Sequence, residues 1–243
     1  MIKGKTVSRL GDRGILIEFS QDISENTLKT ILNFRNRLLE SEFEQKVEIT
    51  NTYNSLLISY PFTIRNFYSE FSKVSSILEL TNISKSFKKR VFKIPVCYEA
   101  KFAPDLETVA RLRKLKKEEI IELHSGSQYL VYFTGFLPGF LYLGGMNKKI
   151  ATARKETPRK MVERGSVGIA EDQTGIYPQE SPGGWQIIGR TPLELFDIKL
   201  ETPTPFVAGN YVQFFPVSEL EYFQIKEEVE HGKYEFQMIE MNG

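Results

Sequence analysis

His124 is the residue of this sequence best suited to move a proton. It lies in the segment LHSGSQY, followed closely by hydroxyl and amide side chains, and an imidazole can exchange a proton near neutral pH. Alternatively, it caps the carboxyl end of a helix, where a donor or a cation is favoured. His231, in a charged stretch beside a glycine, is expected at the surface. Cys97, the only cysteine, is expected to be a buried apolar residue and not a nucleophile.

Two arginines are candidates for binding an anion, and Arg190 is also, with His124, a candidate catalytic residue. Arg159 follows a proline and Arg190 lies in IGRTP, and a guanidinium can hold a carboxylate or phosphate through two parallel hydrogen bonds. An internal salt bridge is the alternative for each. Residues 135–192 contain eight Lys or Arg against five Asp or Glu. This excess favours an anionic ligand, although ordinary exposed charge explains it equally well.

Glycines and aromatic rings alternate in the same window. Ten of the seventeen glycines lie between positions 135 and 190, where the motif GFLPGFLYLGG opens the run. Its candidate binding residues are Phe136, Pro138, Gly139, Phe140 and Tyr142. The three rings have even spacing, so in an extended chain they share one face, while the proline stiffens the loop and the glycine lets it turn. They could form the wall of a pocket for a small flat ring such as a lactam, or they could plug a barrel.

The motifs QTGIYP and SPGGW add polar groups to this window. Their candidate binding residues are Gln173, Thr174, Tyr177, Ser181, Gly183, Gly184 and Trp185. The turn at 181–184 could present consecutive N–H groups to an anion or a developing oxyanion, or it could be a plain tight turn. Trp185, the only tryptophan, either lines a junction with a ligand or partner or closes the end of a barrel.

Several classes of function have no support in the sequence. It contains no GxxxxGK[ST] loop, GxGxxG turn, GxSxG elbow or HExxH pair, and two histidines with one cysteine make a metal site unexpected. A net charge of +1 gives no reason to expect nucleic acid or a membrane surface as partner. No apolar run approaches the roughly 20 residues that span a bilayer, and no signal peptide is evident. We therefore expect a cytoplasmic protein.

The elements that would position these residues form two predicted domains, at 1–90 and 91–243. Periodicity in the first part predicts a strand at 15–19, a helix capped by Asp22 or Ser24 and ending near 40, strands at 47–50 and 55–60, a helix over 64–78 and a strand at 92–96. That order is typical of a small α+β layer resembling a ferredoxin-like domain. The polar, basic segment 81–90 is the predicted linker.

The second part predicts a compact β-barrel. Two short helices, near 105–113 and 117–124, precede a strand at 128–133. Short strands separated by Gly and Pro follow, in SVGIA, TGIYP, WQIIGR, LELFD and YVQFFP, and then a helix at 218–230 and a last strand at 233–239. Many short strands with frequent turns favour a closed barrel over an open sheet.

The central motifs also resemble a known family. GFLPGFLYLGG, GSVGIA, QTGIYP, SPGGW and IGRTP are similar to the signature of the 5-oxoprolinase B-subunit family, also called allophanate hydrolase subunit 1, which includes the KipI kinase inhibitor. IPVCYEAKFAPDLETVARL and GDRGILIEF extend the resemblance over nearly the whole chain. It implies an α+β fold with a cyclophilin-like barrel in the second domain.

The resemblance also implies a function. It points to ATP-dependent opening of 5-oxoproline, a cyclic amide, to L-glutamate by a complex with A and C subunits. ATP is thus expected at the level of the complex, and a chain without a phosphate loop or an activated nucleophile is expected to be inactive alone. The same family implies two alternatives: a module that inhibits a sensor histidine kinase, and a component related to allophanate hydrolase or urea carboxylase.

Overall fold

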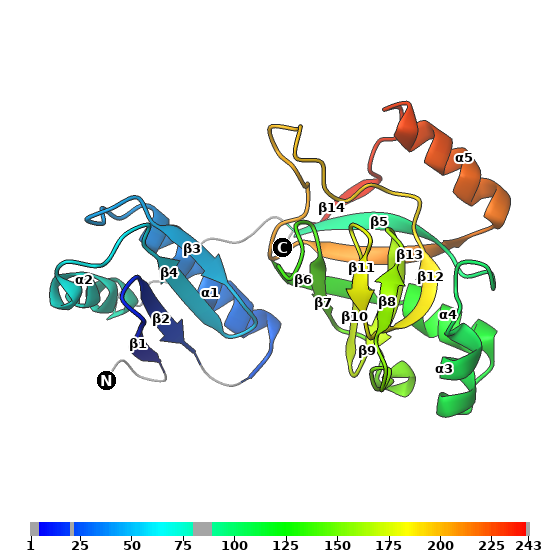
Figure 1. The fold of residues 1–243 in the computed structure, drawn as a ribbon, viewed down its shortest axis with the longest axis horizontal. Coiled ribbons are helices and arrows are strands. Elements are labelled where there is room, and N and C mark those ends of the chain that lie inside the picture. The colour runs from blue at the N-terminus through cyan, green and yellow to red at the C-terminus, as the bar shows by residue number, and fades with distance from the viewer. Residues whose placement is uncertain (1–4, 20–21, 80–88, 242–243) are drawn as a thin grey trace. The chain divides into compact units, whose positions relative to one another are not determined.

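The computed structural model describes residues 5–19, 22–79 and 89–241. The chain forms two compact units, residues 1–87 and 88–243, which are described separately (Figure 1). The predicted linker at 81–90 lies outside the described residues except for its last two, which begin a strand. In the described parts, no helix is both long and apolar enough to cross a membrane.

The first unit is a four-stranded antiparallel sheet with two helices. Its strands, in sheet order, are β1 (Thr6–Leu10), β2 (Gly14–Glu18), β4 (Ser55–Ser59) and β3 (Glu48–Asn51). The helices are α1 (Glu25–Leu39) and α2 (Phe67–Glu79). Ser24 caps α1 by accepting a hydrogen bond from the Thr27 N–H at 3.2 Å, as one of the two predicted caps. Apolar residues of the helices and strands form one core.

One strand of the predicted ferredoxin-like order is placed wrongly, and it lies beyond the predicted domain boundary at residue 90. The segment 92–96 pairs in the second unit, and the edge position beside β2 is taken by β1, which the sequence did not reveal. The resulting order is that of a ferredoxin-like sheet whose edge strand comes from the start of the chain. β1 escaped prediction because none of its residues is buried, so it lacks alternating apolar residues.

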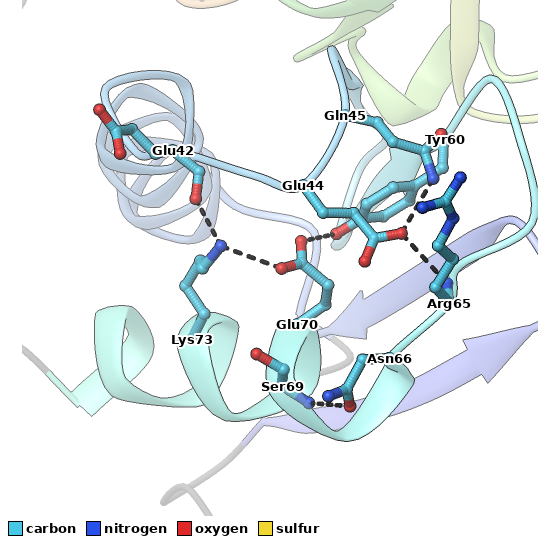
Figure 2. Close-up of polar contacts among 9 residues, drawn as sticks. All are labelled: Glu42, Glu44, Gln45, Tyr60, Arg65, Asn66, Ser69, Glu70 and Lys73. Atoms are coloured by element: carbon cyan, nitrogen blue, oxygen red, sulfur yellow. Dashed lines mark hydrogen bonds and ion pairs between the residues drawn. The ribbon is translucent and has the colours of Figure 1, made fainter.

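A polar cluster ties α2 to the loop after α1 in this unit. The buried Glu70 carboxylate accepts a hydrogen bond from the Tyr60 hydroxyl at 2.7 Å and pairs with the Lys73 ammonium at 2.9 Å. Figure 2 shows Lys73 reaching on to the Glu42 carbonyl, at 2.5 Å. Burial, followed by the hydrogen bond to Glu70, raises the pKa of Tyr60, so its hydroxyl remains a donor.

The second unit contains a closed barrel of seven strands among its described residues. In barrel order they are β12 (Gln186–Arg190), β9 (Ser166–Ala170), β10 (Gln173–Ile176), β7 (Leu141–Gly144), β6 (Gln128–Thr134), β13 (Tyr211–Val217) and β5 (Lys89–Cys97). Pairing of Arg190 with Cys97 joins β12 to β5 and closes the ring. The expected α+β class and the expected barrel are therefore confirmed.

Further elements surround this barrel. The helices are α3 (Leu106–Arg113), α4 (Lys117–Ser125), η1 (Lys148–Ile150) and α5 (Glu219–Glu230). β8 (Arg159–Val162) pairs with β11 (Ser181–Gly183) in a separate two-stranded sheet, and β14 (Met238–Met241) pairs with the start of β5. Figure 1 shows α3 and α4 next to each other at one end of the barrel.

Two predicted strands differ from the structure. LELFD at 193–197 is irregular, although Leu193 and Leu195 are buried in the barrel core. The alternating apolar residues of this segment are thus buried, but its backbone pairs with no neighbouring strand in the described part of the chain. Pro192, just before it, supplies no N–H for such pairing. The last strand begins at Met238 and not at 233, because Tyr234 and Phe236 pack against the core before the chain reaches β5.

Candidate functional site: an aromatic and cationic surface beside the barrel

Four aromatic rings surround Phe140 in a cluster separate from the barrel core. Its ring centroid lies 5.1 Å from that of Tyr142, 5.5 Å from Trp185, 5.6 Å from Tyr177 and 5.7 Å from Phe136. The rings come from β7, the loop before it, and the segments around β11, so the glycine-rich motifs do converge. These edge-to-face contacts are favourable for aromatic rings.

Exposure divides these rings into two layers. Phe140, Tyr177 and Trp185 are buried, whereas Tyr142 is half-buried and Phe136 is 65% exposed. The Arg154 guanidinium lies 5.9 Å from the Trp185 ring centroid. The inner rings therefore serve packing, and a ligand would meet the two outer rings and the cation. Trp185, at 6% exposure, does not form the open junction that its sequence neighbours suggest.

Gly139 fixes the shape of the loop that carries these rings. Its φ is +83°, and an added Cβ would lie 2.5 Å from Phe196 Cβ. We expect Gly139→Ala to lower the free energy of unfolding by about 2 kcal/mol, since both the backbone and the contact become strained. Gly232→Ala is the matched control, because Gly232 has φ +65° but nothing within 4 Å of the new methyl group. Equal losses in urea titrations of the two variants would show that the Phe196 contact is unimportant.

Arg159 is held by a carboxylate that the sequence pattern did not single out. Its Nη2 donates to Asp105 Oδ1 at 2.7 Å, and Lys155 Nζ lies 3.4 Å from the same oxygen. The other oxygen accepts the Ile187 N–H at 2.7 Å. Burial alone would raise the pKa of Asp105, but the hydrogen bonds from Arg159 and Ile187 and the two nearby cations lower it below its usual value. Asp105 is the N-cap residue of α3, but its side chain forms no capping hydrogen bond.

The guanidinium groups of Arg154 and Arg159 also affect the pKa of Tyr177. Burial raises the pKa of its hydroxyl, and the Trp185 backbone, Arg154 and Arg159 partly oppose that rise. Tyr177 therefore remains neutral at physiological pH and serves as a hydrogen-bonding group in a locally positive environment. This arrangement suits a small ligand that carries a carboxylate or a polarised carbonyl.

The turn at 181–184 is not an open anion-binding loop. Ser181 and Gly183 pair with Val162 and Arg159 as strand β11, and the Ser181 hydroxyl donates to the Pro182 carbonyl at 3.3 Å. The Gly184 carbonyl accepts from the Lys155 N–H at 2.8 Å. A Cβ atom added at Gly183 would clash with the Tyr177 hydroxyl. These residues therefore hold the wall of the site in place, and the oxyanion interpretation is not supported.

His124 is placed inside the barrel unit and not at a surface. It is fully buried at the end of α4, its Nδ1 lies 2.7 Å from the Tyr98 hydroxyl and its Nε2 lies 2.9 Å from Thr174 Oγ1. The Thr174 hydroxyl donates its single proton to the Gly168 carbonyl, at 3.0 Å. Nε2 must therefore carry the imidazole proton and Nδ1 must accept from Tyr98.

This geometry does not support catalysis by His124. Burial lowers the pKa of its imidazole to about 3, so the ring is neutral and has no route to a ligand. It is also not a helix cap: its side chain stacks on Phe214, with centroids 4.6 Å apart. Sequence neighbours suggested a polar setting correctly, but the partners are Tyr98, directly after β5, and Thr174 of β10, and not Ser125 or Ser127.

The remaining predicted residues lie apart from the aromatic cluster or at its rim. Arg190 forms an ion pair with Glu163, and its guanidinium lies 5.6 Å from the Phe102 ring centroid. The internal salt bridge is therefore the alternative that the structure shows. Gln173 is half-buried where β10 begins. Pro138 is exposed beside Phe136. Cys97 is buried as expected, and burial raises the pKa of its thiol.

A cavity of about 230 Å³ lies elsewhere in this unit. Residues of α3, α4 and the loop after β5 line it, including Tyr98, Glu99, Glu107 and Lys117. None of the residues predicted from the sequence lines this cavity. It touches the buried network only through Tyr98, the hydrogen-bond partner of His124.

Comparisons with known proteins agree with this architecture. The family described as Carboxyltransferase domain, subdomain C and D, matches residues 5–206. The 5-oxoprolinase B subunit of Bacillus subtilis is 39% identical over 232 residues, which cover 91% of this chain and 97% of that protein. The solved structure of TTHA0988 matches with a TM-score of 0.74 at 30% identity over 85% of this chain, which spans only 40% of that one. Urea amidolyase of Lachancea kluyveri is 27% identical over 97% of this chain and 14% of its own length. A family match over most of the sequence, with a relative of nearly equal length, shows that this chain belongs to the 5-oxoprolinase B-subunit family.

Proposed function

We propose that this chain is the B subunit of an ATP-dependent 5-oxoprolinase and supplies one wall of the site that binds the cyclic amide. The observation that carries the proposal is the similarity to the 5-oxoprolinase B subunit of Bacillus subtilis along nearly its whole length. The aromatic and cationic surface, which consists of Phe136, Tyr142, Arg154 and Arg159, fits that role. Phe136 and the exposed part of Tyr142, whose ring stacks on Phe133 at 4.2 Å, offer aromatic surface to a flat lactam, while Arg154 and Arg159 offer positive charge to its carboxylate.

The chemistry explains why partners are needed. A lactam carbonyl is a poor electrophile, and phosphorylation of its oxygen by ATP would make attack by water feasible. The described residues of this surface and of the rings packed against it include two tyrosines and two arginines, but no base poised beside a nucleophile. Binding and positive charge are what this wall can contribute. Phosphoryl transfer and ATP binding are therefore assigned to the complex with the A and C subunits.

Reconstitution tests this proposal directly. The purified chain alone should release no glutamate from 5-oxoproline, whereas the mixture with the A and C subunits should do so only when ATP is present. Omitting this chain from the mixture is the matched control and should abolish the activity. Robust turnover by the isolated chain, or full activity of the A and C subunits without it, would contradict the proposed role.

A further inference from the structure

Asp105 joins three separate segments of the barrel unit at one buried point. Its own N–H donates to the Ile187 carbonyl at 2.9 Å, and the Ile187 N–H donates back to its carboxylate at 2.7 Å. This reciprocal pair fixes the start of α3 to β12. Because Asp105 is only 3% exposed, its carboxylate needs compensation, and both compensating cations come from the segment that begins the β8–β11 sheet.

The same contact leaves one nitrogen of the Arg159 guanidinium, Nη1, without a partner in the described parts of the chain. Nη2 is bound to Asp105 at 2.7 Å, but Nη1 is buried and has no hydrogen-bond partner among the described residues. A buried, charged donor without a partner is costly, so an oxygen atom that reached Nη1 would gain a strong, charge-assisted hydrogen bond. Of the two ion pairs that the Asp105 carboxylate forms, the one with Lys155, at 3.4 Å, is the weaker.

Arg159 belongs to the aromatic and cationic surface, since its side chain is 27% exposed although Nη1 itself is buried. Arg159 opens β8 and pairs with Gly183 of β11, which leads directly into Trp185. Val162, at the other end of β8, packs in the cluster around Phe140. Arg159 also influences the pKa of Tyr177, which places its charge within electrostatic range of that hydroxyl. A shift of the guanidinium would therefore change the surface that a ligand meets.

We propose that Asp105 is a positioning residue that holds Arg159 by Nη2 and so presents Nη1 to an oxygen atom of the bound cyclic amide. The assignment of that ligand rests on the proposed function. The oxygen is the carboxylate or the ring carbonyl of the substrate, since both are acceptors and Nη1 is a donor only. Asp105 acts through Arg159 and does not itself touch the substrate.

Steady-state kinetics of the complex assembled with the A and C subunits test this inference. Asp105→Asn and Arg159→Lys should each raise the KM for 5-oxoproline by about tenfold or more, with a smaller change in kcat, because the lost contact binds the ground state as well. Lys155→Met should leave KM nearly unchanged. Glu194→Gln removes an exposed ion pair with Arg164 and serves as the control for lost surface charge.

A double variant separates positioning from mere stabilisation. If Asp105 acts only through Arg159, then Asp105→Asn combined with Arg159→Gln should have the same KM as Arg159→Gln alone. Additive effects, or an unchanged KM in Asp105→Asn, would overturn the inference. Should Asp105→Asn fail to fold, Arg159→Lys compared with Lys155→Met decides the question, and equal KM values would again overturn it.

Direct binding distinguishes failure of this inference from failure of the proposed function. Trp185 is the only tryptophan of this chain, so its fluorescence reports titration of 5-oxoproline into the wild-type complex when the A and C subunits carry phenylalanine in place of their tryptophans. Binding without glutamate release would reject the proposed function, and weaker binding by Asp105→Asn would still support the positioning role. Absence of binding by the wild type would overturn both.

Discussion

Lowering the pH from 7 to 4 is expected to destabilise the barrel unit by about 3 kcal/mol through His124 alone. The folded imidazole binds a proton only near pH 3, whereas an unfolded histidine does so near 6.5. Between those values the unfolded chain holds the extra proton. The contribution of neutral His124 to stability is therefore fully present above pH 6.5 and is lost progressively as the pH falls toward 3.

Two histidine variants isolate this effect. His124→Gln removes the titrating group, so it should be less stable at pH 7 but should lose less additional stability between pH 6.5 and 4. His231→Gln is the matched control, because His231 is exposed and bonds only to the Glu227 carbonyl of its own helix. Urea unfolding followed by Trp185 fluorescence reports the barrel unit. An identical pH dependence in wild type and His124→Gln would contradict the assigned burial effect.

The helices and most strands could be predicted because their periodicity reflects one-sided burial. Leu28, Ile31 and Leu38 of α1, and Val74 and Leu78 of α2, are buried at the helical spacing that the sequence shows. Pairing partners could not be predicted, because β5 is apolar on both faces and fits either unit. Its parallel partner β13 lies over a hundred residues later in the chain, and local patterns carry no information about such pairing.

The site was predictable in composition but not in geometry. Glycines with rings indicated where aromatic side chains gather, and Tyr142, Tyr177 and Trp185 do come together around Phe140. Which rings face outward depends on the tertiary packing of β8 and β11, and no local pattern encodes it. Asp105 was not singled out for the same reason, because only the fold brings it to Arg159, 54 residues later in the chain.

The first unit should respond strongly to the loss of a single ammonium group. Lys73 neutralises Glu70, which is 2% exposed, and its removal leaves a buried carboxylate with only the Tyr60 hydroxyl (Figure 2). Lys73→Met is therefore expected to lower the free energy of unfolding of this unit by about 3 kcal/mol. The methionine keeps the apolar stem beside the Phe43 ring, which the ammonium now approaches to 5.4 Å.

The double variant Glu70→Gln with Lys73→Met should recover most of that loss, because a neutral amide oxygen can still accept from Tyr60 and leaves no unpaired charge. Far-ultraviolet circular dichroism in urea follows both units, whereas the fluorescence of Trp185 follows the second unit alone and should show an unchanged barrel transition. The change in stability of the first unit is therefore read from the part of the circular dichroism transition that the fluorescence does not show. Lys29→Met breaks an exposed pair with Glu25 in the same unit and is the matched control, with an expected loss below about 0.5 kcal/mol. A double variant as unstable as Lys73→Met would mean that the loss comes from the bond to the Glu42 carbonyl and the packing of the stem, and not from the uncompensated charge of Glu70.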